Sequence, residues 1–371
     1  MAQDKDQKTL NVPPLRFTGF TDEWKNNKVG NLFEISVAGD IDKSSISHNQ
    51  SEKYPYPIIS NSLENEGIYG YTNKYKCEAG TITVTGRGTL GIAKSRDYKY
   101  YPIVRLLSLK PCDSIDYRFA QYALNLIHYF FEVTGVPQLT APQLSSYDIR
   151  YPTLSEQQKI ARFLSLIDER IATQNKIIED LKKLKSAISR QIFENATFVR
   201  LGELCDVVMG QSPASSSYNT DGDGMPLIQG NLDIKDGETI SRIYTNEPTK
   251  ISLCNELILT VRAPVGIIAK NKMKVCIGRG VCALRNKSII PTSYIYHALD
   301  YSESKWRSIE QGSTFTSVNG EDIKSFTIPL VDNVENTSTL LSRIGDLINN
   351  AVKIYSCLLN QKVYLLSKMF I

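Results

Sequence analysis

Residues 155–193 read SEQQKIARFLSLIDERIATQNKIIEDLKKLKSAISRQIF and contain neither glycine nor proline, which predicts one uninterrupted helix. Apolar side chains recur along it at alternating spacings of four and three residues, with Gln174 and Lys185 as polar breaks. The average period of 3.5 residues is that of a coiled coil. At 1.5 Å per residue, these 39 residues extend about 58 Å.

The sequence also marks where this helix begins. Pro152 precedes it, and Ser155 and Gln158 have the spacing of a capping box, in which both side chains bond backbone amides of the first turn. We therefore expect Ser155 to cap the helix and a globular domain to end just before it.

The whole chain of 371 residues is one arrangement used twice. The matches are residues 29–35 with 201–207, Arg87 and Gly91 with Arg262 and Gly266, and residues 164–167 with 341–344, at offsets of 172, 175 and 177. Their common order and slowly drifting offset indicate a duplication with small loop insertions. Each half is then one domain followed by one helix.

The second helix repeats the apolar seam of the first. The seam residues expected at the interface are Ile160, Leu164, Ile167, Ile171, Ile178, Leu181 and Ile188 in the first helix, and Leu341, Ile344, Ile348, Tyr355, Leu358 and Leu365 in the second. Burial of each seam in its own domain is the alternative. We favour antiparallel pairing of the two helices, because two long unpaired seams would leave apolar stripes in water.

These observations predict an α/β fold with two duplicated domains and two long antiparallel helices. The expected parts are a tail over residues 1–16, a first domain over 17–153, a central helix over 154–196, a second domain over 197–331 and a C-terminal helix over 332–371. Apolar and β-branched runs over 81–85 and 256–261 predict buried strands.

Residues 86–91 spell G-x-G-x-x-G after the first of these strands. In a dinucleotide-binding fold a helix follows this motif at once, whereas the sequence here continues as a short basic stretch without a helical pattern. The second copy keeps only Arg262 and Gly266. A tight turn that presents an arginine is therefore the favoured interpretation, and a nucleotide-cofactor enzyme that uses Gly86–Gly91 is the alternative.

Basic residues are concentrated in two matching windows. Residues 68–105 carry seven Lys or Arg against two acids, and residues 242–287 carry nine against two, although the whole chain has a formal charge of only +4. Tyrosines are interleaved with the basic residues of the first window. Lys and Arg attract phosphates, and Arg, Gln and Thr can bond base edges, so the recurrence favours two DNA-binding surfaces over two solvated basic faces.

A polar loop near the end of each domain, over residues 134–140 and 311–317, is a second candidate for reading bases, although a plain connector fits it as well. The DNA-contact candidates are Arg87, Lys94, Arg96, Lys74, Lys76, Tyr71, Gln138 and Thr140 in the first half, and Arg262, Lys270, Lys272, Lys274, Thr314 and Thr316 in the second.

Other classes of protein are disfavoured. The first ten residues are charged and unlike a secretion signal, and no apolar run has the roughly 20 residues of a membrane helix. Seven scattered cysteines without a C-x-x-C pair indicate reduced thiols and a cytoplasmic protein, and three distant histidines argue against a zinc site. No P-loop or nucleophile motif is present, so we expect no catalytic site in this chain.

Three features carry a family resemblance, namely residues 14–20 (PLRFTGF), residues 152–168 (PTLSEQQKIARFLSLID) and the duplicated plan of the whole chain. Together they mark a resemblance to the specificity subunit of Type I restriction-modification enzymes. It implies two target-recognition domains that each read half of a split double-stranded DNA site, and helices that dock two modification subunits. It places S-adenosylmethionine on those subunits, and ATP and magnesium on restriction subunits, with no cofactor in this chain.

The second helix departs from the family pattern, because residues 331–336 read VDNVEN instead of LSEQQ. Its start and its docking role are therefore less well defined by the resemblance. A stand-alone or decoy DNA-binding protein, which works without modification subunits, remains a further alternative. A rod of about 58 Å would correspond to about 17 base pairs of DNA.

Overall fold

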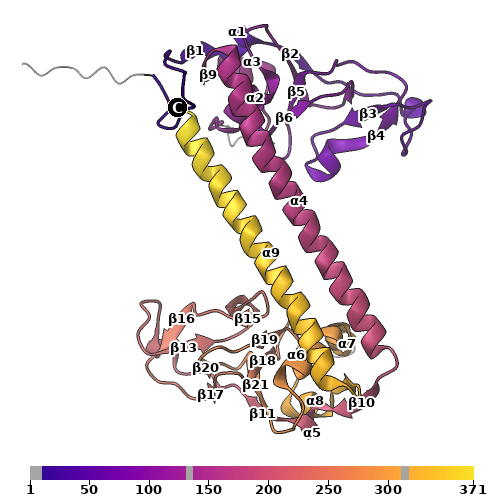
Figure 1. The fold of residues 1–371 in the computed structure, drawn as a ribbon, viewed down its shortest axis with the longest axis vertical. Coiled ribbons are helices and arrows are strands. Elements are labelled where there is room, and N and C mark those ends of the chain that lie inside the picture. Colours follow the sequence, from indigo (N-terminus) through magenta and orange to yellow (C-terminus); the bar gives the residue numbers. More distant parts are fainter. Residues whose placement is uncertain (1–10, 131–136, 311–316) are drawn as a thin grey trace, which may run out of the picture. The chain divides into compact units, whose positions relative to one another are not determined.

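The computed structural model describes residues 11–130, 137–310 and 317–371, without the side chains of 307–310 (Figure 1). Two compact units make up the chain. The first unit contains the chain up to Ala172 together with Ser356–Ile371, and the second unit contains Thr173–Tyr355. Each unit holds one α/β domain and part of each long helix.

The first unit is built on two small sheets. One has the order β2 (Phe33–Val37), β8 (Leu107–Pro111), β5 (Thr81–Val84) and β6 (Ala93–Arg96), and the other has the order β4 (Ile68–Thr72), β3 (Tyr56–Ile59) and β7 (Tyr101–Pro102). A separate antiparallel pair joins β1 (Lys25–Lys28) to β9 (Asp148–Tyr151), so the first and last strands of the domain meet. The short helices are α1 (Val29–Leu32), α2 (Tyr117–Asn125) and α3 (Ala141–Ser146).

The second unit repeats this arrangement with more strands in each sheet. Its six-stranded sheet has the order β11 (Cys205–Met209), β21 (Val281–Asn286), β18 (Leu257–Thr260), β19 (Ile268–Lys270), β15 (Glu238–Thr239) and β14 (Ile234–Lys235). Its five-stranded sheet has the order β12 (Tyr218–Asn219), β16 (Ile243–Thr245), β13 (Met225–Ile228), β20 (Val275–Ile277) and β17 (Ile251–Ser252). The remaining short elements are β10 (Thr197–Arg200) paired with β22 (Thr327–Leu330), and α5 (Leu201–Leu204), α6 (Thr292–Tyr301), α7 (Glu303–Glu310) and α8 (Gly320–Ser325).

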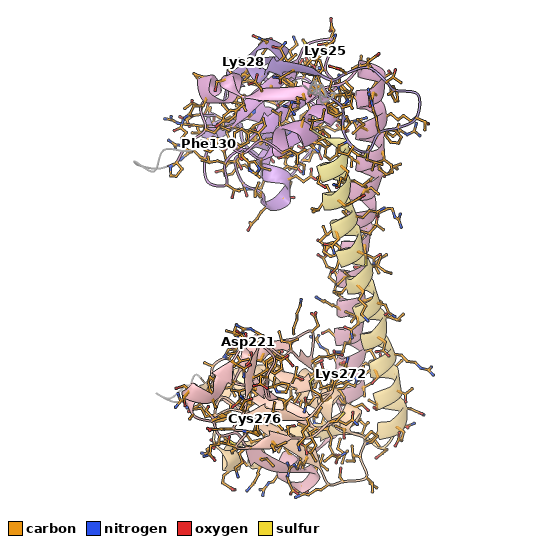
Figure 2. All side chains as sticks on the ribbon, turned by 90° about the vertical axis from the view of Figure 1, so that its left-hand side faces the viewer. Lys25, Lys28, Phe130, Asp221, Lys272 and Cys276 are labelled. Carbon is orange, nitrogen blue, oxygen red and sulfur yellow. The ribbon has the colours of Figure 1, made fainter. Side chains whose placement is uncertain are left out.

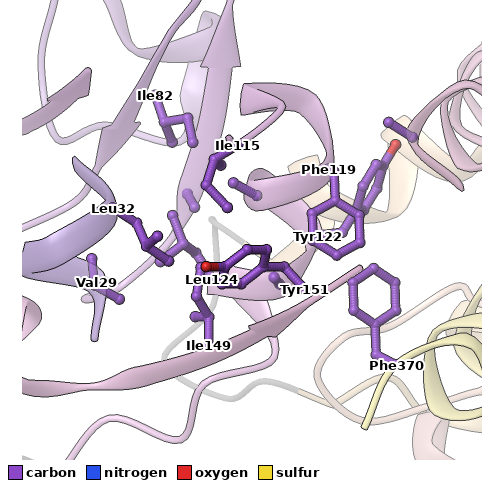
Figure 3. Close-up of a cluster of buried hydrophobic side chains, with 14 of the residues drawn as sticks. Val29, Leu32, Ile82, Ile115, Phe119, Tyr122, Leu124, Ile149, Tyr151 and Phe370 are labelled. Atoms are coloured by element: carbon purple, nitrogen blue, oxygen red, sulfur yellow. The ribbon is translucent and has the colours of Figure 1, made fainter. Parts of the chain in front are cut away.

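Aromatic side chains fix the long helices to the domain cores. In the first unit, Phe119 of α2 stacks on Phe370, which follows helix α9 (Val334–Met369), at 5.3 Å between ring centroids (Figure 3). Trp24 packs edge-on against both rings. In the second unit, Phe193 at the end of helix α4 (Leu154–Phe193) packs edge-on against Tyr294 of α6. The helices therefore share the domain cores and are not loose linkers.

The apolar seams lie where the sequence places them. Of the thirteen expected interface residues, Ile160, Leu164, Ile167, Ile178, Leu341, Ile344, Leu358 and Leu365 are buried, and Ile171, Leu181, Ile188, Ile348 and Tyr355 are half-buried. In the first unit, Lys362 of α9 pairs with Asp168 of α4 at 2.5 Å. In the second unit, Gln174 donates to the carbonyl of Ala351 at 3.1 Å. Later α4 residues meet earlier α9 residues, so the helices are antiparallel.

The expected cap of the central helix is wrong. Helix α4 begins at Leu154, and the Thr153 carbonyl accepts from the amides of Glu156 and Gln157, so Ser155 lies inside the first turn. The polar residues that follow have a tertiary role. The Gln157 side chain accepts from the Asp116 amide and donates to the carbonyls of Ser114 and Pro152, which ties the helix to the start of α2.

The segment before β1 is held against the start of α4. Arg16 forms a two-bond ion pair with Glu156, at 2.7 Å for each bond, and the Glu156 side chain is fully buried. This pairing raises the pKa of Arg16 against the opposing effect of burial. Phe17 packs edge-on against Phe163, and Lys159 lies over the Phe17 ring. The two short motifs that carry the family resemblance are thus one packed structure.

Candidate nucleic-acid interface

Arg87 stands on a tight turn between β5 and β6. The turn is closed by bonds from the Gly91 amide to the Thr85 carbonyl, at 2.8 Å, and from the Thr85 amide to the Ile92 carbonyl, at 3.1 Å. Gly91 has a φ of +79°, and an added Cβ there would collide with the Tyr129 ring. These constraints account for the glycine, and they leave Arg87 exposed to solvent.

No helix follows this turn, because the next element is strand β6. The pyrophosphate of a dinucleotide sits on a helix N-terminus in the fold that G-x-G-x-x-G identifies. Residues 86–91 therefore lack the helix N-terminus on which the nucleotide-cofactor alternative depends. Within the described residues, no cluster of three metal-ligating side chains occurs either.

Three segments of the first unit converge on the Arg87 turn. The Asn61 side-chain oxygen accepts from the amides of Gly86, at 2.8 Å, and Arg87, at 3.4 Å, and its side-chain nitrogen donates to the Val104 carbonyl at 2.9 Å. The Leu139 amide donates to the Gly86 carbonyl at 3.1 Å. The two predicted elements, the arginine turn and the Gln138 loop, are therefore adjacent.

The second unit contains the same construction around Arg262. The turn joins β18 to β19 and is closed by bonds from the Gly266 amide to the Thr260 carbonyl and from the Thr260 amide to the Ile267 carbonyl, both 3.0 Å. Gly266 has a φ of +88°, and an added Cβ would collide with the Trp306 side chain. The Val318 amide bonds the Val261 carbonyl, so the loop before α8 returns to the turn as in the first unit.

Other candidates differ in how accessible the structure leaves them. Arg262, Lys74, Lys76 and Lys274 are exposed. Lys94 is paired with Glu66 at 2.9 Å, and Lys272, labelled in Figure 2, is paired with Glu238 at 2.5 Å. Lys270 is half-buried over the Tyr296 ring, and burial lowers its pKa. Tyr71 is half-buried in β4. Thr314 and Thr316 lie outside the described residues.

Two candidates, Arg96 and Thr140, make hydrogen bonds within the first domain. Arg96 is only 4% exposed and donates to the Thr83 hydroxyl, the Glu66 carbonyl and the Tyr98 hydroxyl, each at 3.0 Å. The Arg96 side chain therefore bonds groups inside the domain and is not free to contact DNA, and we leave it out of the proposed interface. The Thr140 hydroxyl accepts from the Gln143 amide and caps α3 in a capping box.

Two residues at this turn, Arg105 and Asn61, are not among the contacts predicted from the sequence. Arg105 is exposed, and its guanidinium lies 3.5 Å from the Gln138 side-chain oxygen. Arg105 was counted in the basic window, but nothing in the sequence pattern separates it from the other cations there. Asn61 follows strand β3, about 25 residues before the turn that it holds, and no local pattern links the two.

Comparisons with known proteins agree with this duplicated architecture. The model of the Type I restriction modification DNA specificity domain matches the chain twice, over residues 21–183 and 194–361. Since these matches cover most of the chain, it belongs to the Type I restriction-modification DNA specificity family. The predicted α/β fold with two duplicated domains and two long helices is thereby confirmed.

Relatives share parts of the sequence. The chain is 32% identical over 230 residues to the protein named as the MjaX specificity subunit of Methanocaldococcus jannaschii, which covers 56% of this chain and 54% of the relative. It is 33% identical over 150 residues to a type I specificity subunit of Mycoplasma pneumoniae, over 40% of this chain and 45% of the relative. The chain thus spans about half the length of the curated relatives that it matches.

A solved structure shows the same fold over nearly the full length. The S subunit of the Type I restriction-modification system of M. genitalium superposes on 97% of this chain and 99% of that one, with a TM-score of 0.74 at 18% identity. None of the helices in the described ranges is both long enough and apolar enough to cross a membrane.

Proposed function

We propose that this chain is the specificity subunit of a Type I restriction-modification complex in the cytoplasm, and that each of its two domains reads one half of a bipartite DNA site. The observation that carries the proposal is the arginine turn that recurs in both units. In each unit an exposed arginine lies on a turn that is closed by the same two backbone hydrogen bonds. A polar loop from later in the domain returns to this turn. An exposed arginine that recurs on the same hydrogen-bonded turn in both units is suited to bind DNA at two places.

The charge distribution supports two separate DNA-binding surfaces. The basic windows carry net charges of +5 and +7 in a chain of +4, so the remaining residues are acidic overall. Phosphate attraction is then concentrated on one part of each domain and is not spread over the molecule. The loops around the two arginines differ in sequence, which fits two different half-sites.

The outer faces of the helices support docking of modification subunits. In the second unit, α9 carries Leu340, Leu347 and Ile354 at seven-residue spacing, exposed by 44%, 54% and 50%. Helix α4 carries Ile177 and Leu184, also seven residues apart, exposed by 43% and 49%. Apolar stripes at coiled-coil spacing are suited to partner helices. We propose two modification subunits here, with S-adenosylmethionine bound by them, ATP and magnesium bound by restriction subunits, and no cofactor in this chain.

Exchange of one domain tests whether each domain reads one half-site. Residues 197–331 are replaced by the equivalent region of another family member, the chain is expressed with its modification subunit, and methylated positions in host DNA are mapped by single-molecule sequencing. One half-site should change while the other stays the same. A change in both half-sites, or in neither, would contradict the proposal.

A second experiment separates the complex from a stand-alone DNA-binding protein. Leu347→Glu and Ile354→Glu place charges on the exposed stripe of α9 and should abolish co-purification with the modification subunit. Lys353→Glu changes an exposed neighbour on the same helix and serves as the matched control. Full methylation activity in both stripe variants would exclude this docking face, and stable sequence-specific binding by the chain alone would favour the decoy alternative.

A further inference from the structure

The two units share a backbone frame around the arginine turns, so their residues can be compared position by position. Strand β3 pairs in parallel with β7, with Ile59 opposite Pro102, and β13 pairs in parallel with β20, with Ile228 opposite Ile277. The next bond is also shared, because the amide of Ile103 bonds the Ile59 carbonyl and that of Gly278 bonds the Ile228 carbonyl. Arg105 lies three residues after Pro102, and Gly280 lies three residues after Ile277. Arg105 in the first unit therefore corresponds to Gly280 in the second.

Features that both units share are suited to contacts that carry no sequence information. Arg87 and Arg262 occupy the same position on the same closed turn, and both are exposed. Two domains that read different half-sites can use one identical contact only where the DNA is identical, and that is its phosphate backbone. A guanidinium on a rigid turn is well suited to a phosphate oxygen.

Features that differ between the units are suited to reading bases. Arg105 is exposed and its guanidinium lies 3.5 Å from the side-chain oxygen of Gln138. Arginine bonds the acceptor edge of guanine and glutamine bonds the mixed edge of adenine. The second unit cannot repeat this pair, because an added Cβ at Gly280 would collide with the Gln229 carbonyl. Arg279 is the exposed cation at the neighbouring position there.

Asn61 holds the three segments of the first unit in one geometry. Its side chain makes three bonds, to the amides of Gly86 and Arg87 and to the carbonyl of Val104, the residue before Arg105. The equivalent residue after β13 is Gly230, which has no side chain to do this. The Asn61 side chain therefore fixes Arg105 relative to Arg87 in the first unit, and the residue at the equivalent described position of the second unit cannot do the same.

We infer that Arg105 and Gln138 read bases of the half-site recognised by the first domain, that Asn61 is their positioning residue, and that Arg87 contacts phosphate. This inference rests on the proposed function and adds the residues that set the specificity of one domain. Arg105 and Gln138 touch base edges, whereas Asn61 acts through the backbone of the residues that it bonds.

The experiment uses the chain in complex with its modification subunit and four variants, Arg105→Ala, Gln138→Ala, Arg87→Ala and the control Arg150→Ala. Arg150 is an exposed arginine of the same domain, on β9 and outside the three segments. Methylated motifs are mapped in host DNA, and affinity is measured on duplexes with single base changes in each half-site at several salt concentrations.

Arg105→Ala and Gln138→Ala should each relax one or two positions of a single half-site, with discrimination falling about 5- to 150-fold, the equivalent of one good base contact. The other half-site should keep its sequence. Arg87→Ala should weaken binding to all duplexes alike, lower the slope of log affinity against log salt by about 1, and leave the motif unchanged. Arg150→Ala should match the wild type.

A double variant tests the role of Asn61. Asn61→Ala should relax the same positions as Arg105→Ala, and the Asn61→Ala/Arg105→Ala pair should relax them no further than Arg105→Ala alone. A merely structural defect of the first domain would instead add to the effect of Arg105→Ala and would relax positions that Arg105→Ala leaves unchanged. Asn61→Asp keeps the acceptor for the Gly86 and Arg87 amides and should retain part of the discrimination.

Three results would overturn the inference while the proposed function stands. They are an unchanged motif in Arg105→Ala and Gln138→Ala, relaxation of both half-sites by either one, or an altered motif in Arg87→Ala. If the wild-type complex itself methylates no bipartite site and binds no duplex selectively, the proposed function fails, and the inference fails with it.

Discussion

His297 should make the second unit lose stability between pH 7 and pH 5. This histidine of α6 is 3% exposed, and its Nε2 lies 3.1 Å from the Ser342 hydroxyl. Its Nδ1 has no hydrogen-bond partner among the described residues. Burial, and then the charges of Lys185 and Lys270, lower the pKa of His297 from 6.5 to about 3.

The sign and size of the effect follow from proton linkage. Because the pKa is lower in the folded chain, only the unfolded chain binds a proton at this position between pH 6.5 and pH 3. Stability is therefore full above pH 6.5 and falls as the pH is lowered, by about 1.4 kcal/mol per pH unit once the unfolded histidine is charged. From pH 7 to pH 5 the loss is about 2 kcal/mol.

Urea unfolding can be followed in the second unit alone. The chain has two tryptophans, Trp24 in the first unit and Trp306 in the second, so Trp24→Phe leaves Trp306 as the fluorescence reporter. In that background, His297→Gln should remove most of the loss between pH 7 and pH 5. His48→Gln changes an exposed histidine and should leave the loss as it is. A parent and a His297→Gln variant with the same pH dependence would refute the reasoning.

Three further substitutions have expected effects on urea unfolding of the full chain. Arg16→Ala leaves the buried Glu156 carboxylate without its partner and should cost about 3–5 kcal/mol, whereas loss of the exposed Arg118–Asp97 pair in Arg118→Ala should cost less than about 1 kcal/mol. Leu164→Ala empties a fully buried seam position and should cost about 2–5 kcal/mol, whereas Leu166→Ala, 50% exposed on the same helix, should stay within about 0.5 kcal/mol. Gly91→Ala forces a non-glycine residue to a φ of +79° against the Tyr129 ring and should cost about 1–3 kcal/mol, whereas Gly39→Ala, with no atom within 4 Å of an added Cβ, should be nearly neutral. Equal losses within any of these pairs would contradict the assignment of that residue.

Periodic features of this protein could be predicted from the sequence, because each position reports directly on its environment. All thirteen expected seam residues are buried or half-buried, and the strands expected over 81–85 and 256–261 are β5 and β18. The capping prediction failed for a tertiary reason. Gln157 bonds the start of α2 and Glu156 binds Arg16, and these long-range contacts, not a local capping box, fix the start of α4.

The candidate site was predicted in outline only. The sequence located the arginine turns and the loop that returns to each, because these features recur in both halves. It could not separate Arg96, which is buried, from Arg105, which is exposed, because the two have the same chemistry within one basic window. It also missed Asn61, whose role depends on the pairing of β3 with β7 and is invisible until the chain is folded.

The close approach beside each arginine turn has a consequence for how such proteins diversify. In the first unit the glycine is Gly86, whose added Cβ would meet the Arg105 carbonyl, and in the second unit Val261 lies opposite Gly280. Gly280 is also close to a backbone carbonyl, but to that of Gln229, which follows β13, so the two glycines avoid different collisions. Borrowing one residue from the other half, as in Gly86→Val or Gly280→Arg, places a side chain against a backbone carbonyl of another segment, so the backbone around the residue has to change with it. Accumulation of single mutations is therefore a poor route to a new recognition sequence, whereas inheritance of a whole domain by recombination preserves the backbone that fits each residue.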